Sequence, residues 1–179
     1  MKGLKMIENL SIMKLTDEDF EGAYEVIKTT IPYAFDLCHL DDDDEVKAMI
    51  NEKRDLLKQS INNDEPIFFI AKHNDKVIGT ISFAQCSEDI KICTNNEITD
   101  LGEMGSLFIL PQYQSKGIGS ALINYLITYL KKQGIEEVCL ESGYKQAQPK
   151  WIRKFGDPYV IVKDYWAPGV DNMVWKYKI

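Results

Sequence analysis

The chain has 179 residues, of which 45% are hydrophobic and 27% charged, and its formal net charge is −7. This composition can build a substantial core and argues against a disordered chain, while no apolar stretch approaches the ~20 residues that cross a bilayer. The first residues do not form a basic start followed by an apolar segment and a cleavage site. We therefore expect a cytoplasmic globular protein with one domain over residues 1–179 and no membrane partner.

The charge is unevenly placed along the chain. Residues 1–102 contain 11 Lys or Arg and 21 Asp or Glu, whereas residues 103–179 contain 10 and 7. An acidic first half disfavours nucleic-acid binding, which depends on phosphate neutralisation, so we expect no nucleic-acid partner. The mildly basic second half could hold a small phosphorylated ligand, although a solvated acidic surface explains the same numbers.

The cysteines do not predict a metal site. A structural zinc site usually needs closely paired ligands, and no Cys-x-x-Cys pair occurs. Only His39 and His73 could join the cysteines as ligands. We expect no metal and interpret the cysteines as buried or incidental thiols. They are Cys38, Cys86, Cys93 and Cys139.

The first half of the chain predicts two strands and two helices before a third strand. Residues 10–15 form a short apolar run typical of a strand, and a helix with a capping-box start follows at Thr16. A second helix should begin in Asp41 to Asp44, because carboxylates favour the positive end of the helix dipole. Two β-rich runs at 67–71 and 77–83 flank a short Asn/Asp turn and indicate a hairpin.

The second half continues the alternation. Residues 87–102 are polar and predict a connection, and residues 103–110 predict a strand that Pro111 ends. Apolar positions from Ile118 to Leu130 follow one helical face, and Gly134 is a suitable stop. The remaining predicted elements are a strand at 138–140, a short helix near 147–155, a strand at 159–162, an aromatic loop at 164–169 and a strand at 173–177.

The most informative stretch is 103–120, which places a strand, a loop with the pattern Gln-x-x-Gly-x-Gly and an amphipathic helix in succession. Glycines permit close backbone approach, and N–H groups at a helix start can point together at one anion. This arrangement predicts a pyrophosphate-binding loop. A Walker A loop would need Gly-x-x-x-x-Gly-Lys-Ser/Thr, which is absent. A dinucleotide fingerprint would need a third small residue where Leu122 stands.

The stretch resembles the GCN5-related N-acetyltransferase (GNAT) superfamily. The superfamily signature is Gln/Arg-x-x-Gly-x-Gly/Ala after a strand of the form Leu-aromatic-aliphatic-x-Pro. Here Gln114, Gly117 and Gly119 match the loop, and residues 107–111 match the strand. The resemblance covers about residues 4–178, with specific motifs at 103–141. It implies a single α/β domain of the acyl-CoA N-acyltransferase fold, with a mixed, twisted sheet of six or seven strands and about four helices.

The resemblance further implies acetyl-CoA as co-substrate and direct transfer of its acetyl group to a primary amine in a ternary complex. The active site would lie where the fourth and fifth strands separate. Backbone groups of Phe108 and Ile109 would contact the pantetheine arm and the acetyl carbonyl. Backbone amides of the loop would hold the diphosphate. These amides belong to Gln114, Ser115, Lys116, Gly117, Ile118, Gly119 and Ser120.

Two catalytic residues are predicted, one for each proton transfer. The acceptor amine must lose a proton before it attacks, and a positioned base assists. Glu103 matches the base-carrying glutamate of the histone-acetyltransferase branch, although it could be only a strand-end residue where water takes the proton. The family tyrosine that protonates the thiolate is missing, since Trp151 or Ile152 stands in its place. Tyr144 is the candidate acid, and Tyr165 is a nearby alternative.

The acceptor is expected to be a small-molecule amine, a polyamine or a peptide N-terminus. Asp41 to Asp44 could attract a cationic acceptor. Aromatic residues near the C-terminus could border an acceptor pocket or a homodimer interface, or could pack in the core. The alternative functions are a non-catalytic acyl-CoA sensor and a transferase for a longer acyl chain. The aromatic residues are Tyr159, Tyr165, Trp166 and Trp175.

Overall fold

The computed structural model of the protein describes residues 8–40 and 42–179. Their contacts divide the chain into two compact units, which we call the first unit (residues 1–83 and 106–129) and the second unit (residues 84–105 and 130–179). Strand β4 (Gly102–Ile109) runs from one unit into the other. One domain over residues 1–179 stays a prediction. Asp41 and the N-terminal start discussed above lie outside the described residues.

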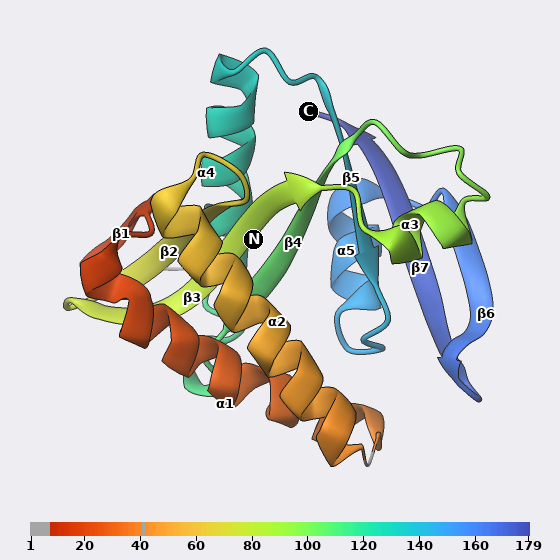
Figure 1. Cartoon of the computed structure of the whole chain (residues 1–179), viewed down its shortest axis with the longest axis horizontal. Coiled ribbons are helices and arrows are strands. Elements are labelled where there is room, and N and C mark those ends of the chain that lie inside the picture. Colours follow the sequence, from red (N-terminus) through yellow and green to blue (C-terminus); the bar gives the residue numbers. More distant parts are fainter. Residues whose placement is uncertain (1–7, 41) are drawn as a thin grey trace, which may run out of the picture. The chain divides into compact units, whose positions relative to one another are not determined.

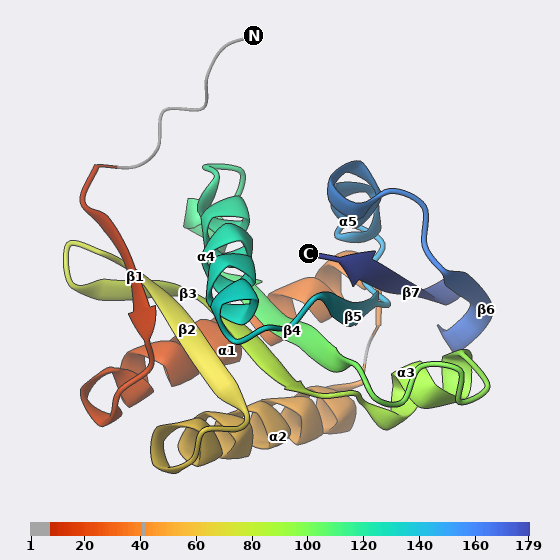
Figure 2. The same cartoon turned by 90° about the horizontal axis from the view of Figure 1, so that it is seen from above.

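The first unit is a sheet with helices on both faces (Figures 1 and 2). Its strands follow the order β1-β2-β3-β4, and β1 and β3 each pair antiparallel with β2. Figure 2 shows α1 and α2 on one face of these strands and α4 on the other. Besides part of β4, its elements are β1 (Leu10–Lys14), α1 (Phe20–Cys38), α2 (Asp43–Asn62), β2 (Ile67–His73), β3 (Lys76–Gln85) and α4 (Ile118–Lys132). The last residues of β3 and of α4 belong to the second unit.

Helix starts in the first unit differ from one another. The side chain of Thr16 makes no capping hydrogen bond, and a short 3-10 helix, Asp17–Asp19, precedes α1, so the predicted capping box does not form. The acidic run does begin α2. Asp42 is its N-cap, and one carboxylate oxygen accepts from the N–H groups of Asp44 at 3.1 Å and Glu45 at 2.9 Å. This satisfies donors that the first helical turn leaves without backbone partners.

The core of the first unit is built from apolar faces of α1, α4 and the central strands. Fully buried side chains include Ile27 of α1, Ile70 of β2 and Leu126 of α4. Gly79 of β3 lets β4 approach closely, because a Cβ there would lie 2.6 Å from Ile109 Cδ1 and 3.1 Å from the Phe108 carbonyl oxygen. Glycine at position 79 therefore leaves room for both the Ile109 side chain and the Phe108 backbone.

The second unit has the strand order β4-β5-β7-β6. Strands β4 and β5 are parallel, with Gly102 opposite Val138 and Glu103 opposite Cys139, while β7 pairs antiparallel with both β5 and β6. Cys86, Ile90, Cys93, Ile98, Cys139 and Val174 form its buried cluster. Besides the start of β4, its elements are α3 (Glu88–Cys93), β5 (Glu137–Ser142), α5 (Gln148–Phe155), β6 (Val160–Ala167) and β7 (Val170–Lys178).

Two predictions for the second unit were wrong. Residues 87–102, predicted as a connection, contain α3, whose N-cap Ser87 accepts from the N–H of Ile90 at 3.3 Å. Six helical residues are too short to display a helical period. Asp164 to Ala167, predicted as a loop, belong to β6. There Asp164 has φ +53 and the β6–β7 register shifts between Val162 and Ala167, so the strand carries a bulge that obscures its alternation.

The fold class is confirmed as α/β with seven strands in a mixed sheet, and the part of the chain that the structure describes holds five α-helices. No helix within residues 8–40 and 42–179 is both long and apolar enough to span a bilayer. Within the same residues, no group of three His, Cys, Asp or Glu side chains is arranged for a metal ion.

Candidate functional site

The predicted donor loop lies in the first unit, between the end of β4 and the start of α4. Ser115 has φ +60 and Gly117 has φ +84, and such left-handed residues turn successive N–H groups toward one side. The side-chain amide of Gln114 donates to the carbonyl of Ile109 at 3.1 Å and fixes the loop to the strand. Hydrogen bonding of the helix begins where the Ala121 N–H donates to Gly117 at 3.0 Å. The first N–H groups of a helix lack backbone acceptors and can bind an anion.

Gly119 tests whether a diphosphate fits this loop. A Cβ at Gly119 would find its nearest atom, Leu107 Cδ2, at 3.8 Å, which is ordinary van der Waals contact. The backbone of Gly119 is not left-handed, so neither packing nor conformation within the described residues requires glycine there. A glycine that the fold does not need leaves the backbone open to a ligand. The loop therefore fits the pyrophosphate of a nucleotide-type donor.

Strand β4 leads into this loop with an irregular backbone. Ser106 has φ +47, which is unusual for a non-glycine residue inside a strand, and its carbonyl accepts from the Thr80 hydroxyl at 2.8 Å. Phe108 and Ile109 are half-buried. Because the Ile109 carbonyl is occupied by Gln114, its N–H and the backbone of Phe108 are the groups through which this strand could contact a donor arm. Their role stays a prediction.

Glu103 lies in the second unit beside a carboxylate that the sequence analysis missed, Glu141. The N–H of Ser87 donates to Glu103 at 2.9 Å, while the Ser87 hydroxyl donates to Glu141 at 3.4 Å. The Asn172 amide, which is fully buried, donates to the other oxygen of Glu141 at 2.6 Å. We call Glu103 and Glu141 the carboxylate pair. One residue, the N-cap of α3, thus contacts both acids.

The charge state of Glu141 is unusual. Burial raises its pKa to about 7, and the nearby charges of Glu103 and Asp89 act in the same direction, against the hydrogen bonds from Asn172 and Ser87. A carboxylate with a pKa near 7 can accept a proton at neutral pH and release it again, which suits a general base. Burial also raises the pKa values of Cys86, Cys93 and Cys139, so these neighbours are protonated thiols rather than nucleophiles.

A sequence signal for Glu141 existed. Cys139 and Glu141 are two positions apart on β5 and therefore share a face of the strand. Cys139 is fully buried, so Glu141, the next residue on the same face of β5, lies at the edge of the hydrophobic core. Charged residues rarely occupy such positions without a partner or a function.

The residues considered for the general acid all lie in the second unit. Tyr144 is half-buried in the turn after β5, and its carbonyl accepts from the N–H groups of Ala147 and Gln148 at the start of α5. Trp151 stacks on Phe155 of the same helix, with ring centroids 5.7 Å apart, and Ile152 is exposed. The Tyr165 hydroxyl donates to Asp89 at 2.7 Å, and burial raises the Tyr165 pKa. Tyr144 as general acid stays a prediction.

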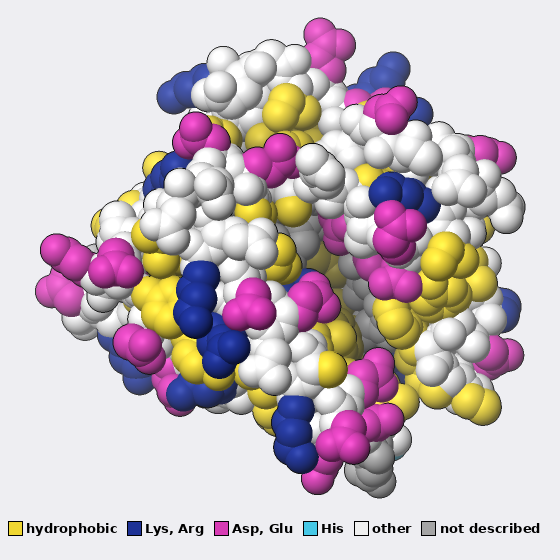
Figure 3. Space-filling model, viewed as in Figure 1, with side chains coloured by type: hydrophobic (Ala, Val, Ile, Leu, Met, Phe, Trp, Pro, Cys, Tyr) yellow, Lys and Arg dark blue, Asp and Glu magenta, His cyan; other side chains and the backbone are white. Residues whose placement is uncertain are grey.

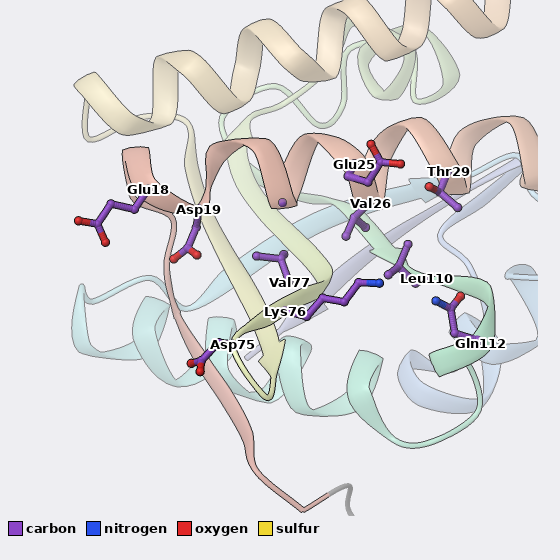
Figure 4. A pocket seen from close by; sticks show the side chains of 11 residues that line it. Glu18, Asp19, Glu25, Val26, Thr29, Asp75, Lys76, Val77, Leu110 and Gln112 are labelled. Atoms are coloured by element: carbon purple, nitrogen blue, oxygen red, sulfur yellow. The ribbon is translucent and has the colours of Figure 1, made fainter.

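The first unit also has an open cleft of about 370 Å³, lined by a mixture of charged, polar and apolar residues (Figure 4). Figure 4 shows Lys76 extended beneath α1 toward Leu110 and Gln112. Two of its acids are already paired, Asp19 with Lys72 at 2.9 Å and Glu25 with Lys28 at 2.6 Å. None of the residues predicted to bind donor or to transfer protons lines this cleft.

A family model described as "Acetyltransferase (GNAT) family" matches residues 23–156. The chain belongs to the GNAT family. The matched range contains β4, the loop of this GNAT protein that is predicted to bind the donor, the carboxylate pair and Tyr144. Among curated proteins, the uncharacterized N-acetyltransferase MJ1207 of Methanocaldococcus jannaschii is 36% identical over 86 residues. The match spans 48% of this GNAT chain but only 36% of that relative's length.

Solved structures share the GNAT fold over nearly the whole chain. The PaiA N-acetyltransferase of Thermoplasma acidophilum, in complex with coenzyme A, has a TM-score of 0.70 at 21% identity and covers 95% of this chain and 99% of its own. The ribosomal-protein-S18-alanine N-acetyltransferase of Escherichia coli has a TM-score of 0.64 at 17% identity, with 95% and 94% covered. At these identities the likeness establishes the fold alone.

Proposed function

We propose that the protein transfers the acetyl group of acetyl-CoA to a primary amine by direct transfer in a ternary complex. The loop before α4 is the observation that supports this proposal in a GNAT chain. Ser115 and Gly117 have left-handed backbones, and the space beside Gly119, in the first turn of α4, is free of close protein atoms. The N–H groups of residues 114–120 would hold the diphosphate. The backbone of Phe108 and Ile109 would hold the pantetheine arm. Bound acetyl-CoA supplies the thioester whose carbonyl carbon the amine attacks.

The carboxylate pair would take the proton that the amine gives up. An alkylammonium with a pKa of ~10.4 has no lone pair for attack, so deprotonation must precede formation of the C–N bond. Because the two carboxylates interact, the proton belongs to the pair rather than to one residue. Glu103, with its charge, raises the pKa of Glu141 and thereby the capacity of the pair to hold a proton. As the C–S bond breaks, Tyr144 or solvent would protonate the leaving thiolate.

Transfer itself can be tested with a panel of amines. The purified protein is given acetyl-CoA together with spermidine, n-hexylamine or a peptide with a free N-terminus, and free thiol release is followed. We expect at least one amine to be acetylated, with the product identified by mass spectrometry. Calorimetric binding of acetyl-CoA without thiol release from any amine would contradict transfer and favour the sensor function.

The sensor remains the second candidate because the family tyrosine is replaced. Trp151 packs on Phe155 and Ile152 is exposed, and neither side chain carries a proton comparable to a phenol. A transferase for longer acyl chains is the third candidate. It predicts faster turnover with butyryl-CoA than with acetyl-CoA in the same panel.

Substitution of Glu103 by glutamine tests the other member of the carboxylate pair. Glu103→Gln removes a negative charge next to Glu141 and retains an oxygen that can accept from the Ser87 N–H. We expect the pKa of Glu141 to fall, and the ascending limb of the kcat against pH profile to move to lower pH. We also expect kcat to drop about ten-fold, since a weaker base accepts the proton less readily. An unaltered profile would show that Glu103 is only a strand-end residue.

The acidic start of α2 tests the charge of the acceptor. Asp43 and Asp44 are exposed, whereas Asp42 is needed as the helix cap. Replacing Asp43 and Asp44 by asparagine should raise KM for spermidine about two-fold at low salt, and not for n-hexylamine, because the trivalent cation responds more strongly to surface charge. The difference should vanish at 0.5 M salt, where the Debye length is only a few ångströms. Equal KM values at low salt would assign these aspartates to helix stability alone.

A further inference from the structure

The second unit holds an aromatic side chain in a position that a regular strand would not give it. Consecutive residues of a strand point to opposite faces, yet the rings of Tyr165 and Trp166 in β6 lie edge to face with centroids 4.9 Å apart. The bulge at Asp164 lies just before the two residues, where the β6–β7 register shifts. The Tyr165 hydroxyl donates to Asp89 of α3.

The bulge is fixed by side chains. Asp171 of β7 accepts from the Asp164 N–H at 3.1 Å and from the Lys163 ammonium at 2.6 Å. The Asp164 carboxylate in turn accepts from the N–H of Gly169 in the turn that follows β6. The direction of Trp166 is therefore set by bonds within the β6–β7 hairpin. A bulge that re-aims one side chain is a feature found beside functional sites.

Trp166 lies over the end of the strand that carries Glu141. A Cβ at Gly143 would be 2.4 Å from Trp166 Nε1 and 2.5 Å from its Cδ1, so the indole occupies the space that a side chain there would fill. Gly143 is the first residue after β5 and follows Glu141 by two residues. The indole thus lies against the backbone that follows Glu141.

The surroundings match a cationic or alkyl amine. Trp166 is 39% exposed, so one part of the indole packs on Gly143 while another part meets solvent. Figure 3 shows further apolar side chains gathered over the region of α3 and β6. Indole faces attract ammonium groups as well as methylenes, and the attraction is worth about two- to five-fold in affinity at a part-exposed site. The Asp89 carboxylate accepts from Tyr165, whose ring packs against the indole. A carboxylate close to such an aromatic pair favours an amine over a neutral or anionic molecule.

We propose that Trp166 is a specificity-determining residue of the acceptor subsite, where it binds the alkylammonium or alkyl part of a primary amine and directs the nitrogen toward Glu141. This inference rests on the proposed acetyl transfer. It assigns Gly143 a role as well, since only a residue without a side chain leaves the indole in place.

Three variants test it, with spermidine and n-hexylamine as probes. Trp166→Ala should raise KM for both amines about five- to ten-fold while kcat and KM for acetyl-CoA change less than two-fold. Trp166→Phe keeps an aromatic face and should raise KM about two-fold. Gly143→Ala pushes the indole aside without removing it and should act like Trp166→Ala. Ile161→Ala is the matched control, because Ile161 is an apolar residue of β6 that is 42% exposed; it should leave every constant unchanged.

A binding readout separates this inference from acetyl transfer itself. Spermidine should change the tryptophan fluorescence of the wild-type protein, and the change should be lost in Trp166→Phe, which still contains Trp151 and Trp175. If the wild type acetylates amines but Trp166→Ala has unchanged KM values, the inference is overturned and the transferase stands. If no amine releases thiol, the transferase fails, and the fluorescence titration still decides: an equal change in both proteins, or none in the wild type, overturns the role of Trp166.

Discussion

Glu141→Gln is expected to lower kcat by about 10²–10³-fold, the usual contribution of a positioned base. Glutamine has the size of glutamate and keeps an oxygen for Ser87 and Asn172, but it cannot take a proton. The ascending limb of kcat near pH 7 should disappear, because burial places the pKa of Glu141 at about 7 and only the ionised form accepts the proton. The affinity for acetyl-CoA, measured by calorimetry, should change less than two-fold.

The same substitution should change stability with a defined sign. The folded chain keeps a proton on Glu141 up to about pH 7, whereas the unfolded chain releases it near pH 4.5. The contribution of Glu141 to the free energy of unfolding therefore falls as pH rises from about 4.5 to about 7 and then levels off. Glu141→Gln removes this fall and should be more stable than wild type at pH 8 by on the order of 2 kcal/mol, but not at pH 4.5. Urea unfolding at both pH values measures the difference.

Glu136→Gln is the matched control for both measurements. Glu136 is exposed and immediately precedes β5, so its replacement removes the same charge without touching the carboxylate pair. Its kcat and stability should follow the wild type at every pH. Full activity of Glu141→Gln with an unchanged pH profile would remove Glu141 from the mechanism and leave Glu103 or water as the proton acceptor.

Gly119→Val is expected to weaken acetyl-CoA binding at least ten-fold. The first atom of the new side chain fits the protein, with Leu107 Cδ2 at 3.8 Å, so the fold tolerates it. Its two methyl groups would project where the diphosphate must approach the N–H groups at the start of α4. Valine is also a better helix former than glycine, so Tm should stay the same or rise slightly. Calorimetry and thermal unfolding measure the two quantities separately.

Two further variants of α4 make this result specific. Gly119→Ala adds only the Cβ and should give an intermediate loss of affinity. Thr128→Val places the same β-branched side chain on the exposed face of α4, remote from the loop in sequence, and should leave the affinity unchanged. An acetyl-CoA affinity of Gly119→Val equal to that of the wild type would show that the diphosphate is bound elsewhere.

Much of the fold could be predicted because several helices and strands have clear patterns within their own sequence. Helix α4 combines a long apolar face with lysines in its last turn and a glycine stop, and its predicted bounds agree with the structure. Helix α3 could not be found this way, because its buried residues Ile90 and Cys93 make only one helical interval. The first half of β6 was predicted as a strand at 159–162, whereas its second half was hidden by the bulge, since an alternation pattern fails wherever one residue turns to the left-handed region.

In the candidate site, too, features formed by neighbouring residues were predictable, whereas features formed by residues distant in sequence were not. The loop–helix geometry at residues 114–132 was predictable, because its glycines and the helix after it are contiguous in sequence, while its role in donor binding stays a prediction. The carboxylate pair was only half predictable. Glu103 and Glu141 are brought together by parallel strand pairing and by Ser87, and no local pattern reports which residues a parallel strand places side by side. The position of Trp166 depends on a bulge and on an absent side chain at Gly143, neither of which a residue pattern encodes.

Cysteine side chains near the carboxylate pair influence the basicity of its two acids. Cys86 precedes Ser87, Cys139 lies opposite Glu103, and Cys93 receives a hydrogen bond from Asn172. A thiol is a weak donor, whereas a serine hydroxyl within reach of a carboxylate would stabilise its charged form. An exchange of cysteine for serine that brought a hydroxyl within reach of either acid would therefore lower the pKa of that acid, while both acids and the predicted donor loop remain unchanged.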